Sequence, residues 1–139
     1  MNILIIEDSQ PRSASTCLQL QALGHAVFPV YDLIAAQHQI EAGTSRIQLV
    51  ILDQDGFDAQ AIAWILAVKA QHPEIHYWVL ASDLPEQERR ALQMVGVAVH
   101  QKPLLFGPVL DRLRRRHAQR APVLPFVDPA LSRPTEGAA

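Results

Sequence analysis

The sequence contains a single cysteine, Cys17, among 139 residues. One thiol excludes an intrachain disulfide framework and any metal site built from several cysteines. The chain therefore needs no oxidising compartment, and we expect it to work in a reducing cytoplasm.

Long hydrophobic runs and an excess of charge are also missing. The apolar stretch at residues 1–6 has no basic leader and is too short for a signal peptide or a bilayer span, so we expect no membrane partner. The formal net charge is −2, which gives no overall field for nucleic acid. Hydrophobic residues make up 49% of the chain and charged residues 19%, the balance of a globular domain.

Five apolar runs of strand length are present. Most are continuous rather than alternating, which is typical of strands buried on both faces of a parallel sheet. The runs cover residues 2–6, 26–30, 47–52, 75–80 and 97–99.

The segments between the runs carry helix signals. Ser9 is placed to cap a first helix that stops before Gly24. Asp32 is placed to cap a second helix that ends at Gly43. Both boundaries follow from side chains that favour helix ends over helix interiors.

Three further helices are expected. One covers residues 58–71, and Pro85 opens the next, with Ser82 as its candidate cap and Gly96 as its end. The last covers residues 106–119. The core side chains expected from the third helix are Ile62, Trp64, Ile65, Leu66 and Val68.

A strand followed by a helix, repeated five times, predicts an α/β fold with a parallel sheet. The leading topology is the flavodoxin-like, doubly wound order 2-1-3-4-5. We expect one domain over residues 1–120. Residues 121–139 contain four of the ten prolines and are expected to be a linker or a disordered tail.

Charged side chains follow three of the predicted strands at the points where they end. Glu7 and Asp8 follow the first run and Asp53 follows the third, and these strands are neighbours in the expected order. Three carboxylates at one edge repel unless a cation neutralises them, and their hard oxygens suit Mg²⁺. Lys102, after the last strand, is placed to pair with a phosphoryl group. The sequence therefore predicts a site that accepts a phosphoryl group on a carboxylate oxygen with Mg²⁺ as cofactor.

Three motifs in the same order and spacing resemble the diagnostic blocks of bacterial response-regulator receiver domains. They are residues 3–8 (ILIIED), 49–53 (LVILD) and 102–104 (KPL). The resemblance covers roughly residues 1–119 and implies a two-component phosphorelay module rather than an enzyme.

The resemblance assigns a role to each matched residue. Asp53 would be the phosphoacceptor, and Glu7 and Asp8 would be Mg²⁺ carboxylates. Asp55 would add its main-chain carbonyl as a metal ligand. Lys102 would contact the phosphoryl oxygens and precede a cis peptide bond.

The sequence departs from the receiver pattern at the switch positions, the residues that in receivers couple phosphorylation to a conformational change. The usual Thr or Ser falls on Ala81, and the usual aromatic residue falls near Val99. Ser82, one position later, would either substitute for the missing hydroxyl or cap the following helix together with Asp83, and the cap is the favoured interpretation. The segment 54–61 (QDGFDAQA) also differs from the common pattern.

Two alternatives therefore stay open. One is a degenerate receiver that acts as a dimerisation or docking module without phosphorylation. The other is a phosphatase of the haloacid-dehalogenase type, which the motif at residues 53–56 also resembles. In that case Asp53 would be the nucleophile and Asp55 the general acid, with Ser82 and Lys102 holding phosphate.

The partners implied by the resemblance are a histidine kinase or a phosphotransfer protein. A homodimer could form through the face of the fourth helix, the fifth strand and the fifth helix, where receivers usually pair. The fifth helix is rich in arginine, at positions Arg112, Arg114, Arg115, Arg116 and Arg120. These cations fit equally a solvated helix end, where they favour the C-terminal dipole, and a dimer or partner face. No aromatic residues alternate with these arginines, so direct nucleic-acid binding is not expected.

Overall fold

The computed structural model describes residues 1–120 of the chain. It divides into two compact units, Met1–Leu104 and a second unit that starts at Leu105, and each is described by itself. The expected tail at 121–139 lies outside the described residues, and the domain boundary at residue 120 stays a prediction.

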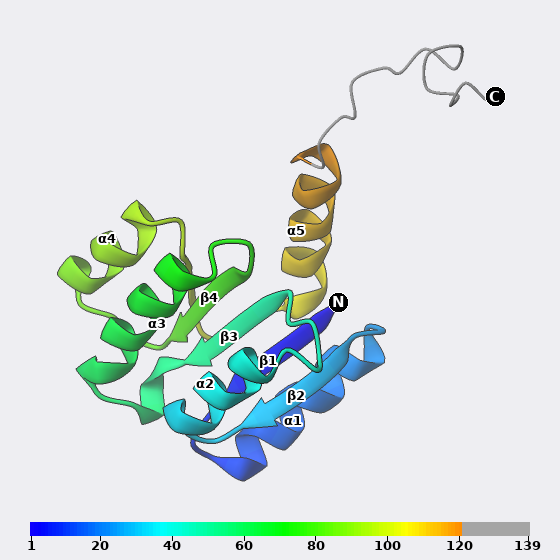
Figure 1. Ribbon diagram of the computed structural model, residues 1–139, viewed down its shortest axis with the longest axis horizontal. Helices are drawn as coiled ribbons and strands as arrows, with labels where there is room; N and C mark the ends of the chain where they lie inside the picture. The colour runs from blue at the N-terminus through cyan, green and yellow to red at the C-terminus, as the bar shows by residue number, and fades with distance from the viewer. Residues whose placement is uncertain (121–139) are drawn as a thin grey trace, which may run out of the picture. The chain divides into compact units, whose positions relative to one another are not determined.

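The first unit is built on a five-stranded sheet in the order β2-β1-β3-β4-β5 (Figure 1). All neighbouring strands are parallel, which confirms the predicted α/β fold and strand order. The strands are β1 (Asn2–Ile6), β2 (Ala26–Val30), β3 (Leu49–Asp53), β4 (His76–Ala81) and β5 (Ala98–Gln101).

The last three strands begin one or two residues later than predicted. Ile47, Ile75 and Val97 are buried although they precede the paired residues. Apolar character reports burial, whereas a strand is defined by its hydrogen-bonded ladder, so the apolar run starts ahead of the strand.

Four helices connect these strands: α1 (Gln10–Ala22), α2 (Leu33–Ala42), α3 (Ala59–Gln71) and α4 (Glu86–Met94). In Figure 1, α1 lies behind the sheet, whereas α2 and α3 lie in front of it. The predicted caps are confirmed, since Ser9 accepts a hydrogen bond from the amide of Arg12 (3.4 Å) and Asp32 from that of Ala35 (2.7 Å). Gly43 ends α2 with φ of 65°, a left-handed conformation that glycine adopts without strain.

The predicted cap of α4 is wrong. Pro85 stands at the N-cap and no side chain donates or accepts a capping hydrogen bond there. The Ser82 hydroxyl instead donates to Asp55 from another loop, a partner that local sequence rules do not reveal.

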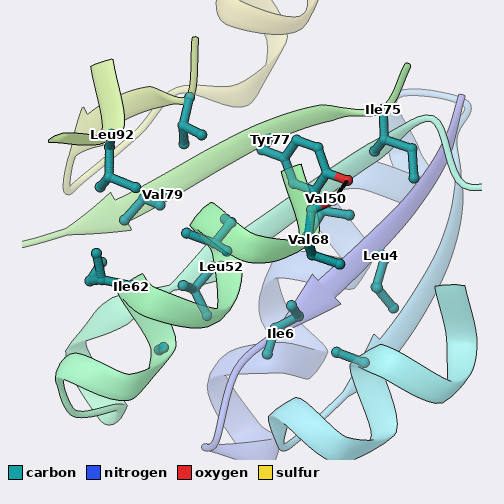
Figure 2. Packing of buried hydrophobic residues seen from close by; sticks show 14 of the residues in the cluster. Leu4, Ile6, Val50, Leu52, Ile62, Val68, Ile75, Tyr77, Val79 and Leu92 are labelled. Atoms are coloured by element: carbon teal, nitrogen blue, oxygen red, sulfur yellow. Dashed lines mark hydrogen bonds between the residues drawn. The ribbon is translucent and has the colours of Figure 1, made fainter. Parts of the chain in front are cut away.

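One hydrophobic cluster fills the space between the sheet and its front helices (Figure 2). Leu52 of β3 and Ile62 of α3 lie in it, and the Tyr77 hydroxyl donates to the carbonyls of Val68 (3.2 Å) and His72 (2.9 Å). The α3 residues that are fully buried are Ala61, Ile62, Ile65 and Val68. Trp64 and Leu66, which were predicted to be buried, are only partly buried at the cluster's margin.

The second unit begins with α5 (Phe106–Arg120). Its arginines at 112 and 114–116 are exposed, and the side chain of Arg120 lies outside the described structure. No helix within residues 1–120 is long and apolar enough to span a membrane.

Candidate functional site

The carboxyl ends of β1 and β3 lie side by side at one edge of the sheet. Ile6 pairs with Leu52 in the register of these strands, so Glu7 and Asp53 follow as neighbours. The amide of Lys102 donates to the carbonyl of Ala81 (3.1 Å), which brings the residue after β5 to the end of β4. The parallel topology thus collects residues from distant parts of the chain at one edge.

Asp53 ends β3 and is 8% exposed. The Lys102 ammonium donates to both of its carboxylate oxygens, at 2.9 Å and 2.8 Å. Burial lowers the pKa of Lys102, but hydrogen bonds from the ammonium to Asp53 and Asp55 outweigh it, so the pKa rises overall. Lys102 therefore stays a cation beside Asp53 at neutral pH. The peptide bond from Lys102 to Pro103 is cis, as the resemblance implied.

Glu7 is almost completely buried beside Asp53. Burial and the hydrogen-bonded contact with Asp53 raise the pKa of Glu7 to about 7, although donors from Ser9 and Arg12 act in the opposite direction. The amide of Ser9 donates to Glu7 Oε2 at 3.0 Å. This carboxyl is consequently poised between its neutral and ionised forms near neutral pH.

Arg12, on the first turn of α1, is a residue of the site that the sequence analysis missed. Its guanidinium lies 3.3 Å from Glu7 Oε2 and 3.5 Å from Asp8 Oδ1. Asp8 and Arg12 are four residues apart, and this helical spacing of opposite charges was a signal available in the sequence.

Asp55 lies in a short 3-10 turn, η1 (Gln54–Gly56), directly after Asp53. Its carboxylate accepts hydrogen bonds from the Ser82 amide (3.0 Å), the Ser82 hydroxyl (2.7 Å) and Lys102 Nζ (3.0 Å). Partial burial raises the pKa of Asp55, but these donors outweigh it and the pKa is lowered overall. Asp55 is therefore a firmly ionised carboxylate with three donors.

The η1 turn is held by the side chain of Gln54. Its amide donates to the carbonyls of Phe57 (3.4 Å) and Asp58 (3.0 Å), which ties the turn to the start of α3. At Gly56 a Cβ atom would collide with the carboxylate of Asp8, so the backbone of the turn and this side chain are closely packed. The segment at 54–61, which departs from the receiver pattern, thus fixes the η1 turn through Gln54 and allows close approach of Asp8 through Gly56.

The expected switch positions Ala81 and Val99 lie on neighbouring strands and are apolar. Ala81 is buried in the hydrophobic cluster and Val99 packs against it. Ser82, the third of these positions, contacts a charged side chain of the site, the carboxylate of Asp55, whereas Ala81 contacts Lys102 only through the main chain. The predicted site residues Asp53, Asp55, Ser82 and Lys102 thus form one connected network.

The carboxylate oxygens at this edge of the sheet are chemically compatible with a magnesium ion. In the part of the chain that is described, no group of three or more acidic, histidine or cysteine side chains is arranged to hold a metal. Mg²⁺, however, is normally bound through one or two carboxylates, with water and phosphate oxygens completing its shell. The carboxylates of Glu7, Asp8 and Asp53 meet that number, and Arg12 places one positive charge beside the first two.

Comparisons with known proteins identify the fold. No protein-family model matches the chain. No curated protein matches it either. Among solved structures, a protein from Burkholderia pseudomallei described as pilus assembly-related has 23% identity and a TM-score of 0.70, over 86% of this chain and 90% of the other. A receiver domain protein from Methanospirillum hungatei has 16% identity and a TM-score of 0.70, over 86% and 95%.

An atypical orphan response regulator described as having a phosphorylation-independent regulatory mechanism is also similar, with 18% identity and a TM-score of 0.67 over 84% of this chain and 94% of the other. At such identities the likeness concerns the fold. The chain has the fold of response-regulator receiver domains, and the predicted resemblance is confirmed at that level.

Proposed function

We propose that the chain is a receiver domain that accepts a phosphoryl group on Asp53 in a two-component phosphorelay. The observation that supports this most directly is the contact of Lys102 Nζ with both oxygens of Asp53, beside the buried carboxyl of Glu7. A reactive carboxylate with a fixed ammonium at its side is suited to a step in which charge develops on transferred oxygens.

In the proposed reaction an oxygen of Asp53 attacks the phosphorus of a phosphohistidine on a partner kinase or phosphotransfer protein. A phosphorus–oxygen bond forms, the phosphorus–nitrogen bond breaks, and its electron pair leaves with the imidazole. Lys102 is already within hydrogen-bond distance of Asp53 and would donate hydrogen bonds to the phosphoryl oxygens as negative charge develops on them. When bound by Glu7, Asp8, Asp53 and the Asp55 carbonyl, Mg²⁺ would neutralise part of the same charge.

The proposed output is a change at a partner surface on α4 and β5. These elements follow the loop that carries Ser82, and this loop contacts the site through Asp55. Participation of α5 in the same surface, and a homodimer formed through it, stay predictions, because α5 belongs to the other compact unit.

Intact-protein mass spectrometry after incubation with acetyl phosphate and Mg²⁺ tests the proposal. The wild type should gain one phosphoryl group, and Asp53→Asn should gain none. Asp83→Asn is the matched control, because it removes an exposed carboxylate from the loop after β4 and should be labelled like the wild type. Absence of an adduct on the wild type, under conditions that label a known receiver, would contradict phosphorylation at Asp53.

A receiver fold that docks partners without phosphorylation is the second candidate. It is favoured by the engagement of Ser82 and Lys102 with Asp55, which occupies these donors in the unmodified protein. The phosphatase alternative is disfavoured by the same contacts, because a general acid must hold a proton and the pKa of Asp55 is lowered.

A further inference from the structure

The loop after β4 and the turn after β3 are joined by one side chain. Asp55 accepts two hydrogen bonds from Ser82, one from its amide at 3.0 Å and one from its hydroxyl at 2.7 Å. These residues are 27 positions apart in the chain, so the contact is tertiary and not a local turn. Lys102 Nζ, at 3.0 Å, joins the same carboxylate to the residue after β5.

The three donors form a set that suits an oxyanion. A backbone N–H, a hydroxyl and an ammonium that converge on two oxygens of one negative group make charge-assisted hydrogen bonds. A phosphoryl group carries the same type of acceptor oxygen with a larger charge. Lys102 also contacts Asp53, so the donors lie next to the carboxylate on which the phosphoryl group would be formed.

We propose that Asp55 is an intramolecular substitute for the phosphoryl group. Its carboxylate occupies Ser82 and Lys102 in the unmodified chain and holds the loop after β4 in the position that a phosphoryl group would otherwise impose. Under this proposal the departure from the receiver pattern, in which the hydroxyl stands at Ser82 and not at position 81, has a function. The hydroxyl at Ser82 is the one that donates a hydrogen bond to Asp55. Phosphorylation of Asp53 would compete with Asp55 for Lys102, and this last statement rests on the proposed function.

In this proposal the Asp55 carboxylate holds the loop after β4 only while Asp53 is unmodified. It does so without a kinase or a metal ion. The loop should be ordered at Ser82 without any ligand, and its order should depend on the charge of residue 55. A receiver with free donors at this position would gain that order only after phosphoryl transfer.

Amide hydrogen exchange of the full chain, read residue by residue by NMR without Mg²⁺ or phosphodonor, tests the inference. Asp55→Asn keeps the shape of the side chain and removes its charge, whereas Asp55→Ala removes all acceptors. We expect the Ser82 amide to exchange about tenfold faster in both variants, the change that the loss of one charge-assisted hydrogen bond produces. Asp83→Asn, on the same loop, should leave the Ser82 amide unchanged.

The outcomes separate this inference from the proposed function. Faster exchange at Ser82 in both Asp55 variants supports the substitute even if Asp53 is never phosphorylated, since no phosphoryl group is present in the experiment. Equal exchange at Ser82 in the wild type and Asp55→Asn would overturn it, whatever the mass spectra show for Asp53. Ser82→Ala, which keeps the amide and removes the hydroxyl, should give an intermediate increase.

Discussion

Glu7 is 2% exposed, and its carboxyl group lies against Asp53. The raised pKa of about 7, against an ordinary value of 4.5, means that the folded protein keeps a proton which the unfolded chain releases in this interval. The contribution of this group to the free energy of unfolding is therefore fully present below pH 4.5 and falls as the pH rises to about 7.

Replacing Glu7 by Gln should remove this pH dependence. The wild type should lose up to about 3 kcal/mol of stability across the interval through this group, whereas Glu7→Gln should not. Urea denaturation at several pH values measures the difference. Glu41→Gln, at an exposed position, should keep the wild-type profile. Parallel pH profiles for the wild type and Glu7→Gln would show that the Glu7 carboxyl ionises normally.

Arg12 is a second residue whose charge affects the site, because its guanidinium forms ion pairs with the carboxylates of Glu7 and Asp8. Since the guanidinium repels a divalent ion at these carboxylates, Arg12→Gln should bind Mg²⁺ more tightly, by a factor of about three to ten. Titration calorimetry with magnesium chloride measures the affinity. Arg46→Gln removes an exposed arginine near the start of β3 and serves as the control. Weaker binding by Arg12→Gln would indicate that Arg12 organises the carboxylates instead of opposing the ion.

At the scale of elements, two glycines at helix and turn boundaries should respond differently to alanine. Gly43→Ala forces a Cβ into the left-handed C-cap of α2 and should cost about 1 kcal/mol of stability. Gly56 does not have a positive φ, so Gly56→Ala should change stability little and displace the Asp8 carboxylate instead. Urea denaturation together with Mg²⁺ titration distinguishes them: stability should fall for the first variant and Mg²⁺ affinity for the second. The reverse pattern would contradict the packing of Asp8 on Gly56.

Elements and their ends were largely predictable from the sequence, because each depends on a few neighbouring residues. Ser9 and Asp32 cap helices through local side-chain contacts, and continuous apolar runs identify buried strands. The convergence of Glu7, Asp53 and Lys102 was predictable too, since it follows from strand order. The contact between Ser82 and Asp55 was not, because it depends on how two loops from different strands approach each other.

At the scale of the whole molecule, one cluster supports the sheet from its front face. Leu52 is fully buried in this cluster, one residue before Asp53 (Figure 2). Leu52→Ala should cost about 3 kcal/mol or more, because it removes a large side chain and leaves a cavity. Leu18→Ala, at a residue that is 67% exposed, should cost about 0.5 kcal/mol or less. Urea denaturation measures both, and similar midpoints for the two variants would contradict the assignment of Leu52 to the core.

The connection between Lys102 and Asp53 joins residues 49 positions apart and links the ends of β3 and β5, which have β4 between them in the parallel sheet. We expect contacts of this kind to form late in folding, because a long loop must close before they contribute to stability. During synthesis the carboxylates of the site leave the ribosome well before their lysine, and a chain cut before residue 102 would carry them without that counter-charge. The ammonium–carboxylate pair is consequently a reporter of the completed sheet, and any probe that detects it counts only those molecules whose fifth strand has been added.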